Sequence, residues 1–513
     1  MLMTMQLTSA QTQLQRHIDQ AIAQGKLNDA HHLLVSNIKK TPNDHFSYFL
    51  LAQVNLAAGD TSKAQKLLEK ALSITKHPLY IAHLAKLATL SGQLMSAQHY
   101  IDQTLKSELE DATYYDLVAN VLTRLGQYET ALVWQKKAFT CQPSNPQVTY
   151  NLAVGYKVMG EFDKSRDLLQ QLITQQPAYF QAHYSLAELN NSHSAKVHLA
   201  QLKALVKSKL SAQDSHYAQH AMALNYEHLG EFKNAYNAFI ASKKNINQLV
   251  KYNADQHSQF CQQITKLSQQ FPNTQTDTDF APIFVVGMPR SGTTLMEKII
   301  NQSDQVQGVG ELNDIVQLCQ GDNKQVLNSN VLANAYKNKH TIEQLNSYQQ
   351  RVRQLVAPSL RSCDKQPFNF YYIDLILAAF PQAKIICMQR GQQDTCIANF
   401  RQLYNPASAF HHYSYDLKNI NRYYYDYCDL INHFASTYKD NVLIIQYEEL
   451  VTEPTSNTQK VYAFCNLEWQ TDCLDFYKQQ SPSATASKVQ VRQPLNRKAI
   501  NYWRHYDFAV NTL

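Results

Sequence analysis

One short segment of the chain combines glycines, an arginine and three hydroxyl side chains. Residues 282–287 are apolar or β-branched, which predicts a buried strand, and residues 295–300 have helical spacing. Between them lies Met288-Pro289-Arg290-Ser291-Gly292-Thr293-Thr294. A glycine-containing loop between a strand and a helix presents backbone N–H groups and the helix N-terminus to an anion, and hydroxyl groups add donors. The segment therefore predicts a phosphate-binding loop.

The loop differs from the loops that hydrolyse nucleoside triphosphates. Gly287 and Gly292 have the Walker A spacing, but Thr293 stands where that pattern has lysine. A kinase or NTPase needs the lysine at the β- and γ-phosphates. The nearest cation here is Arg290, whose guanidinium suits a terminal oxyanion group such as a sulfate. ATP chemistry is disfavoured and is kept as an alternative.

The hexapeptide at residues 289–294 resembles the 5′-phosphosulfate loop of sulfotransferases that use 3′-phosphoadenosine-5′-phosphosulfate (PAPS). The resemblance covers about residues 280–510 and is nearest to tyrosylprotein sulfotransferases and to bacterial enzymes that fuse tetratricopeptide repeats to such a domain. It implies a loop that binds the donor through Arg290, Ser291, Gly292, Thr293 and Thr294, with Arg290 also acting in catalysis.

Two further motifs follow in the order that the resemblance requires. Glu311, in Gly310-Glu311-Leu312, matches the catalytic base that takes the proton of the acceptor hydroxyl. Taken alone, it would be a solvated loop glutamate. Lys365, in Asp364-Lys365-Gln366-Pro367, matches the lysine that offsets charge on the leaving phosphate.

The 3′-phosphate site is implied at the end of the apolar run at residues 384–390, where the resemblance makes Arg390 its ligand. The family has a serine eight residues later, and this chain has Ala398. The missing hydroxyl removes one donor to a charged acceptor, worth ~1–3 kcal/mol. Arg401 lies three residues further on and can compensate. The departure leaves donor affinity open, as well as the alternative of an inactive enzyme that serves as a protein-binding scaffold.

The resemblance implies three more contacts near the C-terminal end. Tyr447 follows the apolar run at residues 442–446 and would lie against the nucleotide, or else pack in the core. Residues 485–496 resemble a lid in which Ser487 acts in catalysis beside the departing phosphate. Lys488 and Arg492 would reach the 3′-phosphate. Lysine and arginine supply the positive charge, so we expect no metal.

The first half of the sequence is a repeat array. Gly25, Gly59, Gly92, Gly126, Gly160 and Gly230 are separated by 34, 33, 34, 34 and 70 residues. A small residue follows each glycine by five positions. Glycine at a turn, with small residues where two helices cross, matches the 34-residue tetratricopeptide repeat. We expect about seven helix-turn-helix units, whose concave groove binds protein or peptide.

The expected fold is multidomain: an all-α repeat superhelix at residues 1–245, a connecting helix and linker at 246–279, and an α/β parallel-sheet domain at 280–513. The even distribution of a net charge of +6 disfavours nucleic acid as a partner. The sequence shows no signal peptide and no apolar run long enough to span a membrane, and its nine cysteines lack disulfide or zinc spacing. We therefore expect a cytoplasmic enzyme. The resemblance and the repeat groove favour a protein or peptide tyrosine as the acceptor, with a glycan or small molecule left open. Pairing of the chain with itself also stays open.

Overall fold

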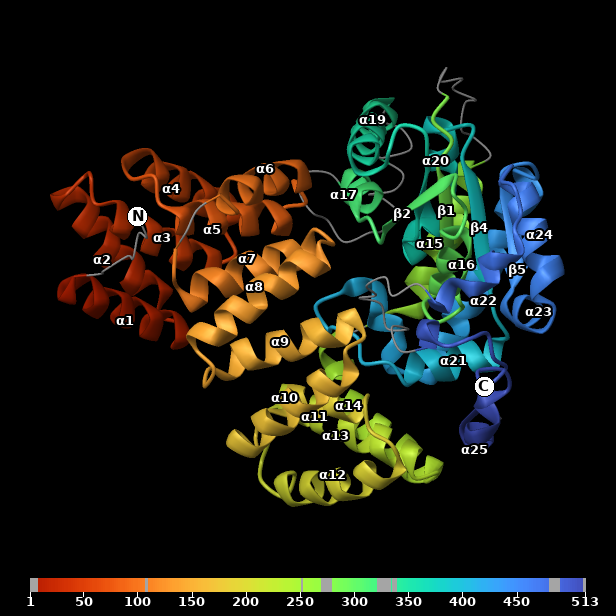
Figure 1. Cartoon of the computed structure of the whole chain (residues 1–513), viewed down its shortest axis with the longest axis horizontal. Helices are drawn as coiled ribbons and strands as arrows, with labels where there is room; N and C mark the ends of the chain where they lie inside the picture. The colour runs from red at the N-terminus through yellow and green to blue at the C-terminus, as the bar shows by residue number, and fades with distance from the viewer. Residues whose placement is uncertain are drawn as a thin grey trace. The chain divides into compact units, whose positions relative to one another are not determined.

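The computed structural model describes residues 8–106, 109–250, 252–268, 279–320, 334, 339–478 and 490–510. The chain forms two compact units, residues 1–168 and residues 169–513 (Figure 1). The predicted boundaries at residues 245 and 279 remain predictions. Within the described residues, no helix is both long and apolar enough to cross a membrane.

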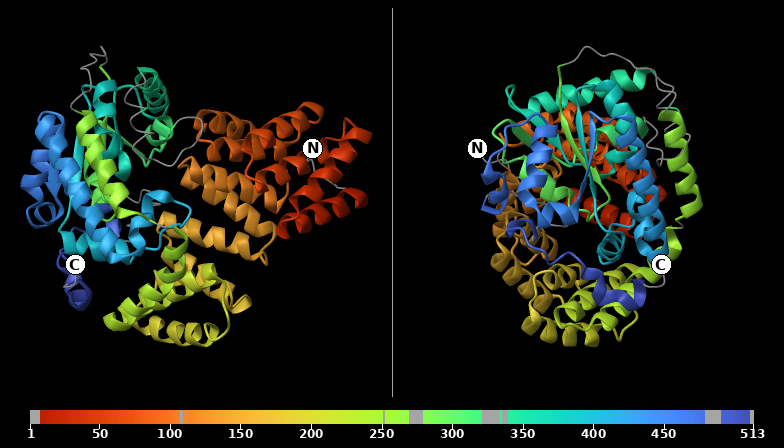
Figure 2. Two further views of the ribbon diagram at one scale, coloured as in Figure 1. Left: turned by 180° about the vertical axis from the view of Figure 1, so that it is seen from behind. Right: turned by 90° about the vertical axis from the view of Figure 1, so that its right-hand side faces the viewer.

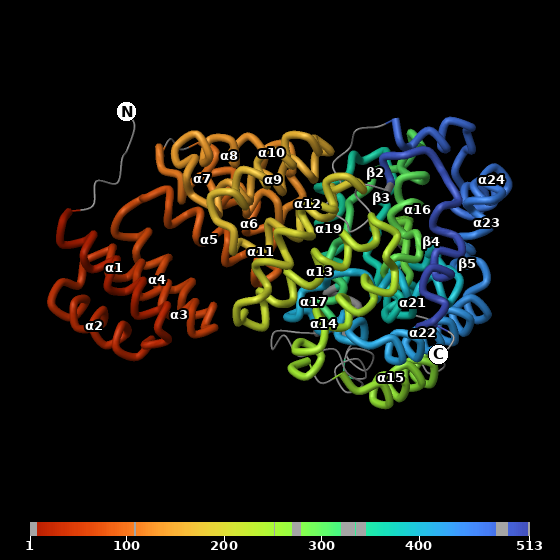
Figure 3. Tube along the Cα trace, turned by 90° about the horizontal axis from the view of Figure 1, so that it is seen from below, coloured from red at the N-terminus to blue at the C-terminus, as the bar shows by residue number. Residues whose placement is uncertain are grey.

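The first unit is a stack of helical hairpins, and Figure 3 traces the first two of them as α1–α2 and α3–α4. Its helices are α1 (Ser9–Ala23), α2 (Leu27–Lys40), α3 (His45–Ala57), α4 (Thr61–Ile74), α5 (Pro78–Leu90), α6 (Leu94–Thr104), α7 (Ala112–Arg124), α8 (Tyr128–Cys141) and α9 (Pro146–Met159), with α10 (Phe162–Gln175) continuing past residue 168.

The repeat register has the physical basis that the sequence predicts. All six glycines of the register have a left-handed backbone, with φ between +72° and +83°. The small residues that follow them are buried, and Ala30, Ala64, Ala97, Ala131 and Ala235 are at most 2% exposed. Each of these six hairpins therefore turns at a glycine and closes where side chains are small, which confirms the predicted tetratricopeptide fold.

The second unit begins with the last repeat helices: α11 (Phe180–Ala187), α12 (Ser192–Leu205), α13 (Ala212–His228), α14 (Phe232–Val250) and then α15 (Ala254–Ser268). The turn before α12 has no glycine, and the Asn191 side chain caps that helix instead by accepting from two backbone N–H groups. Helix α14 extends to Val250, and α15 begins at Ala254. Most of the predicted polar linker lies outside the described residues.

A parallel sheet follows, with the order β2-β3-β1-β4-β5. Its strands are β1 (Ile283–Gly287), β2 (Val306–Gly310), β3 (Arg361–Asp364), β4 (Lys384–Gln389) and β5 (Val442–Gln446). The three apolar runs of the sequence form β1, β4 and β5, as predicted. The sequence analysis did not identify β2 and β3, which are short and contain glycine or polar residues in place of an apolar run.

Helices cover both faces of the sheet (Figure 2). Phe284 and Val286 of β1 belong to a core shared with α15, α20 (Ile373–Ala379) and α22 (Leu417–Thr437). Ile283 and Val285 belong to a second core with α16 (Thr293–Ile300) and α24 (Pro454–Phe464). Burial on both faces explains why β1 is uniformly apolar. The remaining elements are α17 (Asp314–Gln320), α19 (Lys339–Leu355), η1 (Pro367–Tyr372), α21 (Gln392–Phe400), η2 (Ala409–Tyr415), α23 (Tyr447–Thr452), η3 (Thr471–Lys478), η4 (Gln490–Arg492), η5 (Tyr502–Tyr506) and α25 (Asp507–Val510).

Candidate active site

Every strand of the sheet ends next to one of the residues that the sequence singles out. Arg290 lies in the loop after β1, and Glu311, Lys365, Arg390 and Tyr447 directly follow β2, β3, β4 and β5. Because all strands are parallel, their carboxyl ends meet at one edge of the sheet. The strand order reverses around β1, and open α/β sheets bind ligands at such a point.

Two positions of the loop accept only glycine. Gly292 has φ +101°, and a Cβ there would lie 2.6 Å from Cδ2 of Tyr447. A Cβ on Gly287 would lie 2.7 Å from the carbonyl oxygen of Met388 in the neighbouring strand. Both contacts are far below the usual distance, so the loop passes as close to its surroundings as a backbone can. Helix α16 starts at Thr293, and its first N–H groups face the loop.

Arg290 has a strained backbone that the structure around it maintains. Its φ of +70° is left-handed, which costs a non-glycine residue ~1–2 kcal/mol. Asn399 supports the loop, because its Nδ2 donates to the carbonyl oxygen of Pro289 at 2.8 Å. The hydroxyls of Tyr404 and Tyr413 in turn donate to Asn399 Oδ1 at 3.1 and 2.9 Å. The sequence analysis missed Asn399, which no local motif marks.

A pocket of about 280 Å³ opens at this edge of the sheet. Its lining includes four of the predicted residues, Arg290, Gly292, Arg390 and Tyr447. Ala398 and Arg401 also line it, so the position of the missing serine hydroxyl faces the pocket together with the arginine that follows it. The other lining residues are Leu295, Asp394, Phe476, Val491, Gln493, Pro494, Leu495, Asn496, Lys498, Ala499 and Tyr502.

Arg390 is fixed on several sides. Its Nη1 donates to the carbonyl oxygen of Arg290 at 3.1 Å, and its Nη2 donates to the carbonyl oxygen of Ala499. The guanidinium lies 5.0 Å from the centre of the Tyr447 ring, a cation–π contact. Asp394 lies 3.8 Å from Nη2. The side chain is therefore held rigidly with one edge on the pocket.

Asp394, which the sequence analysis did not predict, ties the C-terminal segment to the pocket. Its carboxylate accepts hydrogen bonds from the backbone N–H groups of Asn501 at 2.8 Å and Trp503 at 2.9 Å. These contacts place Lys498, Ala499 and Tyr502 on the pocket wall.

A second group of charges surrounds Lys365. The Lys365 side chain is 1% exposed, donates to Glu311 and lies 3.8 Å from Oε2 of Glu297. Burial acts to lower the pKa of Lys365, but the carboxylates of Glu311 and Glu297 raise it overall. Burial raises the pKa of Glu297, and the positive charge of Lys365 offsets part of that rise. Glu297 escaped the sequence analysis, although an acidic residue within the apolar helix at residues 295–300 was a visible signal.

Tyr404 connects the two groups. Burial raises the pKa of its hydroxyl, the charge of Arg290 opposes that rise, and the charge of Glu311 adds to it. The charges of the loop arginine and of the glutamate thus act on the same buried hydroxyl.

Six predicted residues that the structure describes are not among those that line the pocket: Ser291, Thr293, Thr294, Glu311, Lys365 and Arg492. Ser487 and Lys488 lie outside the described residues. Arg492 lies in η4 and is not among the described residues that line the pocket; its charge instead helps to lower the pKa of Lys298, after burial and against Glu297.

The donor set fits an anionic ligand. The buried Oγ of Ser291 and Nε of Arg390 have no hydrogen-bond partner among the described residues. Arg390 lines the pocket and Ser291 lies in the loop beside it, and both atoms can donate to an oxyanion. Together with the glycine loop and the start of α16, they are donors of the kind that bind a phosphate or sulfate group.

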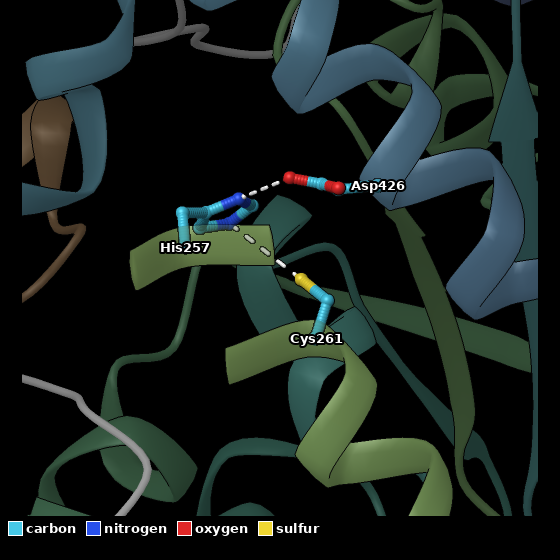
Figure 4. Close-up of side chains that lie close together, drawn as sticks. All are labelled: His257, Cys261 and Asp426. Atoms are coloured by element: carbon cyan, nitrogen blue, oxygen red, sulfur yellow. Dashed lines mark hydrogen bonds and ion pairs between the residues drawn. The ribbon is translucent and has the colours of Figure 1, made fainter. Parts of the chain in front are cut away.

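A cluster elsewhere in the second unit brings His257, Cys261 and Asp426 together, with ligand atoms within 4.8 Å of one another (Figure 4). Asp426 contacts Nδ1 of the imidazole at 2.8 Å, whereas the Cys261 sulfur lies 3.7 Å from Nε2. Nε2 also bonds the hydroxyl of Tyr371 at 2.7 Å. The carboxylate and the thiol thus contact different nitrogens of the ring, and the nitrogen facing the thiol is already bonded to the Tyr371 hydroxyl. The arrangement orients a histidine that joins α15 to α22.

Comparison with known proteins identifies the class. A model of the sulfotransferase family matches residues 282–471, and a model of the tetratricopeptide repeat matches residues 47–78. The chain carries a sulfotransferase-family domain together with tetratricopeptide repeats.

Individual relatives are distant. An uncharacterized protein of Aquifex aeolicus is 24% identical over 511 residues, which cover 94% of this chain and 66% of that protein. A protein-tyrosine sulfotransferase of Drosophila melanogaster is 24% identical over 237 residues, which cover 43% of this chain and 46% of that enzyme. The chain thus spans less than two thirds of the length of these relatives.

Solved structures that match include the sulfotransferase domain of the Synechococcus PCC 7002 olefin synthase, at 18% identity and a TM-score of 0.33, covering 46% of this chain and 91% of that domain. The tetratricopeptide protein YrrB, described as having an unusual peptide-binding site, matches at 14% identity and a TM-score of 0.28, covering 40% of this chain and 96% of its own.

Proposed function

We propose that this protein transfers a sulfuryl group from PAPS to a hydroxyl acceptor, and that the acceptor is a tyrosine of a protein or peptide. One observation carries the proposal: two arginines, a buried lysine and a glutamate follow four parallel strands and meet at one edge of the sheet. The loop among them has a phosphate-binding form but lacks the lysine of an NTPase.

In this proposal the donor is held at both phosphate ends. Arg290 and the loop from Ser291 to Thr294 bind the 5′-phosphosulfate, and Arg390 binds the 3′-phosphate. Tyr447 lies against the nucleotide. Lys488 and Arg492 add charge, and Ser487 approaches the departing phosphate. The two buried donors at Ser291 and Arg390 support this assignment. No metal is required, since these cations supply the charge.

The charges around Lys365 supply the groups that the transfer step needs. Glu311 takes the proton of the acceptor hydroxyl, whose oxygen then forms a bond to sulfur. The bond from sulfur to the 5′-phosphate oxygen breaks, and its electron pair stays on that phosphate. Lys365, with Arg290, stabilises the charge that develops there. In the structure Lys365 pairs with Glu311, so donor and acceptor binding must separate the two side chains.

Support for a tyrosine acceptor comes from two sources. The Drosophila relative is a protein-tyrosine sulfotransferase, and its match covers 237 residues. Tetratricopeptide repeats are a fold that binds peptides and protein surfaces. The mass-spectrometric assay described below would also reveal a glycan or small-molecule acceptor.

The test begins with ligand-induced stabilisation. Adenosine 3′,5′-bisphosphate (PAP) at ~100 times its Kd should add ~2.7 kcal/mol to the stability of the protein, and ATP with magnesium should add little. Stabilisation by ATP with magnesium but not by PAP would favour a P-loop kinase, and no response to either would favour an inactive scaffold. Mass spectrometry of peptide and glycan acceptors incubated with PAPS then seeks a gain of about 80 Da, one SO₃ unit on oxygen.

The base assignment has its own variant. Glu311→Gln should lower kcat by ~10²-fold or more. PAP affinity should be retained, because the side chain does not line the nucleotide pocket in the described part of the chain. Wild-type kcat in this variant would remove Glu311 from the mechanism.

A further inference from the structure

The donor pocket contains an arginine that a repeat helix holds in place. Arg401 follows α21 and lines the pocket. Its Nε and Nη2 donate to the two carboxylate oxygens of Glu227 in α13, with an Nη2–Oε2 distance of 2.6 Å. The Glu227 side chain is 6% exposed and that of Arg401 25%. The pair joins residues 174 positions apart in the chain.

Neighbouring contacts fix both partners. The hydroxyl of Tyr506 donates to Glu227, and the ring of Tyr502 lies 4.4 Å from the Arg401 guanidinium. His220 of α13 donates to the carbonyl oxygen of Arg401 at 2.9 Å. Lys243 of α14 donates to the next carbonyl, that of Gln402, at 3.2 Å. The repeat helices therefore hold the backbone as well as the side chain at this corner of the pocket.

The ion pair leaves Arg401 able to bind a second anion. A guanidinium has five N–H donors, and a side-on pair with a carboxylate uses two of them. Burial acts to lower the pKa of Arg401, but Glu227 raises it overall, so the group stays charged at any working pH. Ala398, which also lines the pocket, offers no hydrogen bond.

We propose that Glu227 is a positioning residue for the donor site: it aims Arg401 at the 3′-phosphate, where this arginine replaces the hydroxyl that Ala398 lacks. The inference rests on the proposed use of PAPS. The last repeat hairpin, α13–α14, is then part of the donor site as well as of the repeat array.

The experiment compares two nucleotides on the full-length protein by calorimetry. PAP carries the 3′-phosphate, and adenosine 5′-phosphosulfate lacks it. Glu227→Gln keeps the shape of the side chain and removes its charge. The variant should bind PAP roughly tenfold or more weakly than the wild-type protein and bind adenosine 5′-phosphosulfate with unchanged affinity. Only PAP has the 3′-phosphate that Arg401 is proposed to contact. Ala398→Ser in the Glu227→Gln background should restore part of the loss.

Two further variants provide the controls. Tyr506→Phe removes one hydrogen bond to Glu227 and should shift PAP affinity in the same direction by less, which keeps the test usable if Glu227→Gln folds poorly. Asp426→Asn removes the carboxylate of another ion pair in this unit, between α15 and α22, and should not change the ratio of the two affinities.

The outcomes separate the two proposals. Equal weakening of both nucleotides by Glu227→Gln, or no weakening of PAP, overturns the positioning role while the sulfotransferase proposal stands. Failure of the wild-type protein to bind PAP overturns the proposed function, and the positioning role with it.

Discussion

Replacing Gly292 by alanine tests whether the loop after β1 forms the donor site. The substitution adds one methyl group at a backbone with φ +101°, 2.6 Å from Cδ2 of Tyr447 and 3.5 Å from Cε of Met388. Gly126 provides a control in a repeat turn of the first unit. It has φ +78°, and a Cβ there would meet nothing within 4 Å.

The two substitutions differ mainly in what the methyl group meets. Gly126→Ala should cost the left-handed backbone strain alone, ~1–2 kcal/mol. Gly292→Ala incurs at least that strain, because its φ of +101° lies farther from the left-handed minimum at about +57°. In addition, carbon atoms pack best at about 3.5–4.0 Å, so the Tyr447 ring must move by roughly 1 Å. Overpacking of that kind adds ~1–3 kcal/mol. The total for Gly292→Ala is then about 2–5 kcal/mol.

Urea unfolding measures the stabilities, and calorimetry measures PAP binding. Tyr447 also lies under the Arg390 guanidinium, so its displacement disturbs both sides of the pocket. We expect Gly292→Ala to weaken PAP binding at least tenfold and Gly126→Ala to leave it unchanged. If Gly292→Ala bound PAP as tightly as the wild-type protein, the donor would not lie in this loop and the reasoning would be wrong.

Three other predictions follow from buried groups. Glu297→Gln removes a carboxylate 3.8 Å from Lys365, so the pKa of Lys365 should fall and the alkaline limb of the kcat profile should move to lower pH; an unchanged profile would contradict the coupling. Burial lowers the pKa of His216 from 6.5 to about 4. The contribution of the neutral, buried histidine to the free energy of unfolding is therefore fully present above pH 6.5 and is lost as the pH falls toward 4. That amounts to about 2 kcal/mol between pH 7 and pH 5 in urea unfolding. His216→Asn, which can keep the 2.9 Å bond to the Ser242 carbonyl, should remove that acid sensitivity, and an equal loss in the variant would exclude this histidine as its source. Finally, a chain of residues 169–513 should fold and bind PAP, whereas residues 280–513 alone should aggregate, because Ala221, Ala223 and Phe239 of the repeat helices share the core of the sheet. Cooperative folding of the shorter chain would refute this.

The features that were predictable from the sequence are those with a local pattern. The repeat turns were visible because a left-handed backbone selects glycine every 34 residues or so, and β1 and β4 because burial on both faces gives apolar runs. Strand β5 is an apolar run although most of its residues are only partly buried. Strand β2 gave no such signal, since it contains two glycines and a glutamine. Local spacing thus identifies an element where one environment acts on consecutive residues.

The supports of the site were not predictable, because they arise from contacts between distant segments. Asn399 reaches back 110 positions to Pro289, and Asp394 reaches forward 107 to Asn501. Nothing in a single sequence marks either residue, since asparagine and aspartate are ordinary on a helix surface. Glu227 is the extreme case. It lies in a repeat helix whose pattern assigns it no role, and its partner Arg401 follows α21, 174 positions later in the chain.

The alternative of a lapsed enzyme can be weighed by what the pocket costs the folded chain. Arg290 keeps a left-handed backbone, worth ~1–2 kcal/mol of strain. Ser291 Oγ and Arg390 Nε are buried without a hydrogen-bond partner among the described residues. A scaffold that binds partners through its repeats gains nothing from a strained loop, whereas in a donor site the loop and the Arg390 guanidinium, which lines the pocket, would bind a phosphate or sulfate group. Ala398 removes one hydrogen-bond donor, but the pocket retains the strained loop and the donors of Ser291 and Arg390 that have no partner within the described part of the chain. These features favour an active enzyme with a changed 3′-phosphate contact over an inactive scaffold.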